Sequence, residues 1–134
     1  MNSRQRTIAA LLLALTLGLW PAVAGAAEMV NEVLLVVKDD EVLAFSGLKN
    51  NWVSQKLSPN EKVLAQRSRG NVAVVTTKNR LLGFSAFSAA WSEVSLRVNE
   101  LVEDLQADGN VATVVTDLRI FGFNAHTGLW IEAD

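Results

Sequence analysis

Three eight-residue stretches decide the fold: FSGLKNNW at 45–52, FSAFSAAW at 84–91 and FNAHTGLW at 123–130. Each begins with phenylalanine and ends with tryptophan, and successive stretches are 39 residues apart without insertion or deletion. A fixed period of about 20 to 50 residues is the signature of a repeat architecture, in which one small unit recurs and stacks on its neighbours. The sequence therefore predicts three repeats over 32–70, 71–109 and 110–134, of which the last is the shortest.

Each repeat is expected to contain four short strands. In the second repeat we expect them at 72–77, 80–86, 91–97 and 101–107, because these segments are rich in β-branched or alternating apolar residues and are separated by polar turns. The stretch 98–105 also has apolar residues at helical spacing, but the matching stretch of the first repeat contains Pro59, so we favour a strand there. The first strands of the repeats, such as 72–77, are apolar on both faces, which predicts that each is buried between two neighbouring layers.

The pattern aromatic-x-x-x-Thr-x-x-Trp, seen most clearly at 123–130, resembles half of the kelch repeat of β-propellers. The preceding segment 63–84 is similar to that family's inner strand, turn, second strand and third strand. The family's double glycine is absent, since Thr76-Thr77 and Val115-Thr116 stand in its place. The resemblance implies an all-β fold of propeller-like four-stranded blades. It places complete blades at 62–97 and 101–133, and a third at 33–57 that lacks only its first strand.

About three blades are fewer than the four to eight that usually close a propeller ring. An isolated stack would leave apolar faces and strand edges open to solvent. We therefore expect a homo-oligomer, and favour a two-fold dimer that closes a six-bladed ring. Two alternatives stay open: a β-trefoil, which also has three repeats of four strands, and a fragment of a longer repeat protein.

Residues 1–27 have the pattern of a secretory signal peptide. Arg4 and Arg6 precede an apolar run at 8–20, Pro21 ends that run, and small residues follow at 22–27. The run of about 13 residues is shorter than the roughly 20 that a membrane-spanning helix needs. We therefore expect a secreted or periplasmic protein with no membrane span after signal cleavage, and a single all-β repeat domain over 28–134.

The composition excludes several classes of function. Removing the two arginines of the leader leaves 12 − 2 = 10 basic residues against 14 acidic ones, a net charge of −4. This balance argues against a nucleic-acid partner, which requires a basic surface. The chain has no cysteine, so disulfides and cysteine-ligated metals are excluded. No motif indicates a cofactor or a metal site.

The repeated tryptophans are the first candidate binding residues. Trp52, Trp91 and Trp130 would serve as stacking platforms for sugars if they faced solvent, but repeat-marking aromatic residues more often pack between strands or blades. We favour packing for the tryptophans. For the accompanying phenylalanines we expect a place in the core, and these are Phe45, Phe84 and Phe123.

Arg80 and Arg119 recur at one position of the repeat, where the first repeat has Glu41. Such an arginine has the donor geometry to bind a carboxylate or a sugar hydroxyl. We favour instead an ion pair with an acidic residue of a neighbouring blade. The change of sign at Glu41 predicts a dimer seam where Glu41 of one chain meets an arginine of the other, so that Glu41→Arg weakens association.

No set of residues predicts catalysis. His126 is the only histidine and is expected to face solvent, so no nucleophile–histidine–acid set can be assembled. A hydrolase would need carboxylates such as Glu93 or Glu132 to converge in a ring. The expected function is a non-enzymatic binding or protein-interaction module with a protein or glycan ligand. The alternative is a lectin that uses its repeated tryptophans and arginines for multivalent sugar binding.

Overall fold

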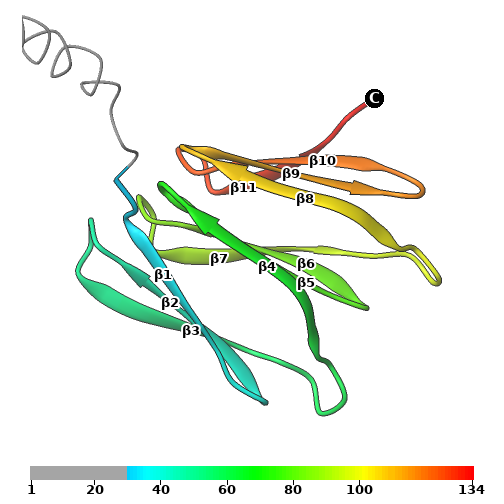
Figure 1. Cartoon of the computed structure of the whole chain (residues 1–134), viewed down its shortest axis with the longest axis horizontal. Coiled ribbons are helices and arrows are strands. Elements are labelled where there is room, and N and C mark those ends of the chain that lie inside the picture. The colour runs from blue at the N-terminus through cyan, green and yellow to red at the C-terminus, as the bar shows by residue number, and fades with distance from the viewer. Residues whose placement is uncertain (1–29) are drawn as a thin grey trace, which may run out of the picture.

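The computed structural model describes residues 30–134, which are all-β and adopt a propeller-like arrangement of three antiparallel sheets (Figure 1). The predicted signal peptide lies outside the described residues. Sheet 1 contains β1 (Val33–Val37), β2 (Glu41–Ser46) and β3 (Asn51–Lys56). Sheet 2 contains β4 (Val63–Arg69), β5 (Val72–Thr77), β6 (Arg80–Ser85) and β7 (Ala90–Ser95). Sheet 3 contains β8 (Val102–Asp108), β9 (Val111–Thr116), β10 (Ile120–Asn124) and β11 (Leu129–Glu132).

Each sheet is a simple meander, in which strands consecutive in the chain are neighbours in the sheet. The expected strands of the second repeat agree with β5 to β8 to within two residues at each end. The helical alternative for 98–105 is wrong, because β8 begins at Val102. Among the described residues no strand is shared between two sheets. The arrangement therefore follows the propeller-like expectation and not the trefoil alternative.

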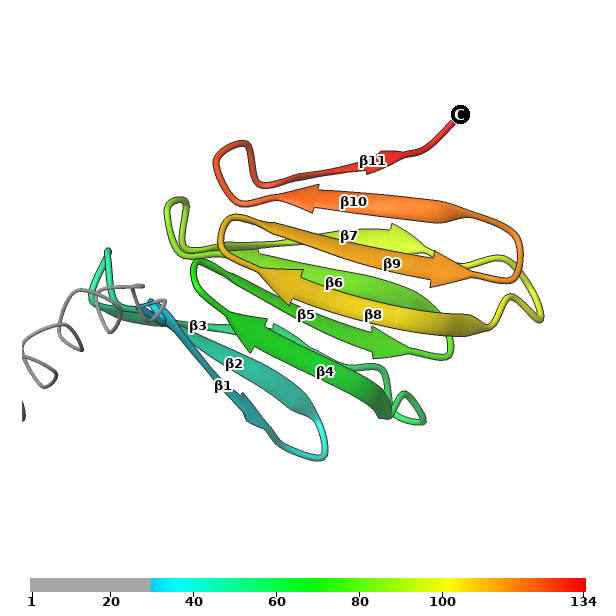
Figure 2. The same ribbon diagram turned by 45° about the horizontal axis from the view of Figure 1, so that its top comes forward.

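The sheets are stacked face to face, and Figure 2 shows β4 of sheet 2 lying between β1 and β8 of its two neighbours. Sheet 2 is consequently covered on both faces, and all six residues of β5 are buried as predicted. The equivalent strands β1 and β9 are buried on one face only. The expectation of two buried faces fails for them because sheets 1 and 3 are the ends of the stack.

The repeats share backbone conformation as well as sequence. The turn between the last two strands of every sheet has one residue in the left-handed region, with φ of 54° at Asn50, 49° at Ala89 and 68° at Gly128. These three residues are 39 positions apart. Only glycine adopts this conformation without steric cost, so the turn of sheet 3 is the least strained of the three.

The core consists of two joints between sheets, and both joints have the same polarity. We call the face that carries the phenylalanine and tryptophan of a repeat its aromatic face, and the other face its receiving face. The aromatic face of sheet 2, with Phe84, packs on the receiving face of sheet 1, with Val33 and Ala44. The aromatic face of sheet 3, with Phe121 and Phe123, packs on the receiving face of sheet 2.

Candidate interaction surfaces

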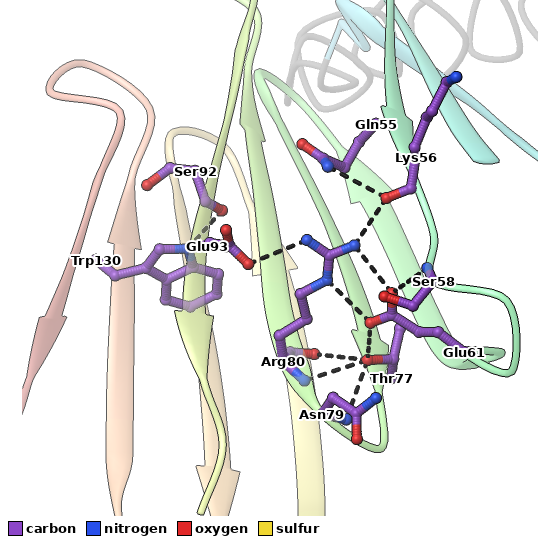
Figure 3. Close-up of polar contacts among 10 residues, drawn as sticks. All are labelled: Gln55, Lys56, Ser58, Glu61, Thr77, Asn79, Arg80, Ser92, Glu93 and Trp130. Carbon is purple, nitrogen blue, oxygen red and sulfur yellow. Dashed lines mark hydrogen bonds and ion pairs between the residues drawn. The ribbon is translucent and has the colours of Figure 1, made fainter. Parts of the chain in front are cut away.

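Arg80 lies at the start of β6 and holds three parts of the chain together (Figure 3). Its Nε and Nη2 atoms donate to the two carboxylate oxygens of Glu61, both at 2.9 Å. Nη2 also donates to the backbone carbonyl of Lys56 in sheet 1, at 2.7 Å, and Nη1 donates to Glu93 at 3.0 Å. The guanidinium thus ties sheet 2 to the last strand of sheet 1.

Arg119 repeats this arrangement one sheet further along. It binds Glu100 through Nε at 3.0 Å and Nη2 at 2.6 Å, and Nη2 also donates to the backbone carbonyl of Ser95 in sheet 2, at 3.2 Å. Its Nη1 lies 3.7 Å from Glu132. We call each set of arginine, buried glutamate and carbonyl an arginine clasp. Because both arginine side chains are largely buried, at 15% and 11% exposure, and are already paired with glutamates, neither forms an open site for an external anion.

The buried glutamates of the clasps are held in their charged form. Thr116 donates its hydroxyl to Glu100 at 2.6 Å, and Glu100 also accepts the backbone N–H of Arg97. The hydrogen bonds from Arg119 lower the pKa of Glu100 to about 2, against the effect of burial, which raises it. For Glu61 burial raises the pKa, but the hydrogen bonds from Arg80 and its other donors outweigh that effect and the pKa is lowered.

The clasps differ from the sequence expectation in the identity of the acid. The favoured interpretation paired each arginine with an acidic residue of the neighbouring blade. The main partners, Glu61 and Glu100, lie instead in the connections that lead from one sheet to the next, and the neighbouring sheet contributes only a backbone carbonyl. Sequence reasoning missed both glutamates, although they too are 39 residues apart.

The three tryptophans lie in successive sheets and do not converge. The indole of Trp91 donates to the carbonyl of Val53 in sheet 1 at 3.0 Å, and that of Trp130 donates to Ser92 in sheet 2 at 3.1 Å. Both rings are partly buried in joints between sheets. Trp52 has no sheet in front of it among the described residues and is 51% exposed.

In the part of the chain that the structure describes, the stack therefore ends in two uncovered apolar faces. The aromatic face of sheet 1 is lined by Leu34, Val36, Leu43, Phe45 and Trp52. The receiving face of sheet 3 is lined by Val111, Ile120, Gly122, Leu129 and Ile131. Their exposure comes from the missing neighbour and not from a change of residue type. Ile120 is 48% exposed, for example, whereas Leu81, its equivalent in sheet 2, is fully buried.

The other candidate residues lie at the margins of the sheets. Glu41 begins β2 and forms a long ion pair with Lys38, at 3.8 Å. His126 is exposed, as predicted, and stacks on Phe87, in the turn between β6 and β7, with ring centroids 4.7 Å apart. Within residues 30–134 there is no group of three or more histidine, cysteine or acidic residues that could hold a metal ion. The same residues contain no helix long and apolar enough to cross a membrane.

Comparison with known proteins assigns no family. No protein family and no curated protein matches the sequence. The N-terminal domain of Nup159 is similar to this chain at 10% identity and a TM-score of 0.43, and the match covers 79% of this chain and 32% of that one. A chain of a S. cerevisiae complex of Dbp5 with Nup159 and Gle1 has 11% identity and a TM-score of 0.42, with coverage of 78% of this chain and 32% of that one. The extracellular domain of the putative one-component system BT4673 from B. thetaiotaomicron has 7% identity and a TM-score of 0.45, with coverage of 77% of this chain and 15% of that one. This chain thus spans about a third or less of each structure, and the similarity identifies no function.

Proposed function

We propose that this protein is a non-enzymatic interaction module that is exported from the cytoplasm, as its leader predicts, and that it binds through the two ends of its sheet stack. The observation that carries the proposal is the pair of uncovered apolar faces. Contiguous exposed apolar patches on a soluble domain mark sites of interaction, because leaving them in water is unfavourable. Both faces belong to β-sheets, and so they suit a partner that presents another sheet.

A binding role is also supported by how the polar residues are used. The arginine clasps, which hold the sheets together, use both arginines and the buried glutamates Glu61 and Glu100. His126 is committed to a ring stack. Glu93 and Glu132, the carboxylates that a hydrolase would need, are each paired with the arginine of their own repeat.

Site-specific photocrosslinking in the producing cells tests the proposal. A benzophenone amino acid replaces Trp52 on one end face or Ile131 on the other, and Lys78, in an exposed hairpin turn of sheet 2, is the control position. We expect discrete adducts from both end faces, none from Lys78, and recovery of a shortened chain outside the cytoplasm. A folded chain that forms no adduct from either end face, or that stays in the cytoplasm, would refute the proposal.

Carbohydrate binding is the second candidate, and the exposed ring of Trp52 is the observation that favours it. An exposed indole beside Phe45, with ring centroids 5.1 Å apart, offers an apolar platform of the kind that sugars stack on. Binding to a glycan array that Trp52→Ala abolishes, in a chain that stays folded, would support this role. Retained binding in that variant would exclude Trp52 as the platform.

A further inference from the structure

The two end faces are the same two surfaces that already pack together inside the chain. At each internal joint the aromatic face of one sheet covers the receiving face of the sheet before it. One end of the stack presents an unused aromatic face, on sheet 1, and the other presents an unused receiving face, on sheet 3. A second copy of this chain therefore carries the surface that each end lacks.

We propose that the partner of each end face is a second copy of the chain, bound head to tail. The aromatic face of sheet 1 in one copy covers the receiving face of sheet 3 in the other, and a second such joint closes the pair into a ring of six sheets. This inference rests on the proposed function and names its partner. Heterologous contacts of this kind form closed rings when their rotation closes, and six sheets fall within the range of closed propellers.

The shape of the receiving face supports this joint. At Gly83 of sheet 2, an added Cβ would lie 2.8 Å from ring carbons of Phe123 and 3.0 Å from Trp130, so the glycine leaves the space that these rings fill. Gly122 is the equivalent residue of sheet 3, and nothing lies within 4 Å of its Cβ position. In the proposed joint, Phe45 and Trp52 of the second copy fill that space.

The aromatic face is already arranged for such a contact. The ring centroids of Phe45 and Trp52 are 5.1 Å apart at an interplanar angle of 48°. The buried pair of Phe123 and Trp130 has nearly the same geometry, at 5.1 Å and 47°. No rearrangement of the exposed pair is needed for it to bind as its buried equivalent does, which lowers the entropic cost of association.

Hydrogen bonds between sheets extend across the proposed joint in the same register. The acceptors of the indole N–H groups of Trp91 and Trp130 are 38 residues before them, in the previous sheet. The equivalent acceptor for Trp52 is the backbone carbonyl of Ile131 in the second copy. At the sheet ends, Asn71 donates its backbone N–H to Gly109 and its side-chain amide to Asn110, at 2.8 and 2.6 Å. The corresponding polar groups of sheets 1 and 3 would meet at the joint.

The proposed joint lacks an arginine clasp, which makes it weaker than the internal joints. Glu41 occupies the repeat position of Arg80 and Arg119, which donate to the backbone carbonyls of Lys56 and Ser95 in the previous sheet. By the same repeat spacing, Asp134 of the second copy takes the place of Lys56 and Ser95 opposite Glu41. In the proposed joint Glu41 therefore lies near an acidic residue, and not near the arginine that the sequence predicted. Glu41→Arg should therefore strengthen association, the reverse of that expectation.

The test is sedimentation velocity of the mature chain and of two variants that each block one face. Trp52→Glu places a charge on the aromatic face, and Gly122→Leu fills the space on the receiving face. Because every joint needs one face of each kind, we expect a two-copy species for the wild type and a weakening of about tenfold or more for either variant alone. Val98→Glu removes a 90% exposed apolar residue from a loop outside both faces and should leave association unchanged.

Mixing the two variants gives the decisive result. An unblocked aromatic face from one variant meets an unblocked receiving face from the other, so a species of two chains should reappear with one intact joint. Failure of the mixture to recombine, with both chains folded by circular dichroism, would overturn the head-to-tail joint. A folded wild-type monomer at all concentrations, or a mass that grows without limit, would overturn the ring. A crosslink from the end faces to a different protein would leave the proposed function standing and refute the self-partner.

Discussion

Replacing either of two equivalent glycines with alanine should have opposite effects on stability. Gly83 and Gly122 occupy the same position in successive repeats, in β6 and β10, and both belong to receiving faces. Gly83 is covered by the next sheet, whereas Gly122 is at the uncovered end. The pair therefore separates the effect of packing between sheets from the effect of the substitution itself.

The magnitude at Gly83 follows from the distances. A new Cβ would be 2.8 Å from two ring carbons of Phe123, which is well inside the roughly 3.5–4.0 Å at which carbon atoms pack best. Phe123 is 1% exposed and cannot move aside without disturbing the joint. Overpacking of this kind costs about 1–3 kcal/mol, and the lower backbone entropy of alanine in the unfolded chain returns about 0.5–1 kcal/mol. We expect a net loss of about 1–2 kcal/mol.

At Gly122 the substitution causes no overpacking, because nothing lies within 4 Å of the new Cβ, and only the favourable effect of alanine on the entropy of the unfolded chain remains. We expect Gly122→Ala to raise the free energy of unfolding by about 0.5–1 kcal/mol in dilute, unassociated protein. The same methyl group would occupy the space assigned to Phe45 of a second copy. The variant should therefore weaken self-association while it stabilises the single chain.

Urea unfolding of both variants, followed by tryptophan fluorescence at low protein concentration, measures the difference. With a denaturant slope of about 2 kcal/mol per molar, a net separation of about 2 kcal/mol between the two variants moves their midpoints about 1 M apart. Equal midpoints for Gly83→Ala and Gly122→Ala, with unchanged slopes, would refute the packing of sheet 3 on sheet 2 through this glycine.

Three further outcomes follow from the same structure. The pKa of Glu100 is about 2 in the folded protein against an ordinary value of 4.5, so its charged form contributes on the order of 3 kcal/mol to stability. This contribution is complete above pH 4.5 and is lost as the pH falls toward 2. Acid unfolding should show the loss, and Glu100→Gln should make stability depend less steeply on pH in this range. Arg119→Met leaves Glu100 buried without its partner and should cost about 3–5 kcal/mol in urea unfolding, while a wild-type midpoint would show that the clasp contributes nothing. Ala89→Gly removes the steric strain of an alanine held at a φ of 49° and should raise the free energy of unfolding by about 0.5–1 kcal/mol, and with it the melting temperature. A lower melting temperature would contradict this account of the turn.

The sequence by itself determined the repeat, the fold class and most of the strand boundaries. These features are local: the run of β-branched residues along 72–77, polar turns such as Lys78-Asn79, and phenylalanine and tryptophan at a constant spacing are all properties of neighbouring residues. The burial of Phe84 and Phe123 followed in the same way, because a repeated aromatic residue in an apolar strand usually packs in the core. The same expectation is wrong for Phe45, which is only half-buried because no sheet of the described residues covers the aromatic face of sheet 1.

Only the tertiary structure decided which face of each sheet meets which. Alternation along a strand separates two faces but does not say which of them packs on the sheet before and which on the sheet after. The clasps of Glu61 and Glu100 could not be predicted either, because these residues lie outside the strands and contact their arginines only when two sheets are stacked. Gly122 has the same local sequence role as Gly83, and it differs because no sheet formed by residues 30–134 lies in front of it.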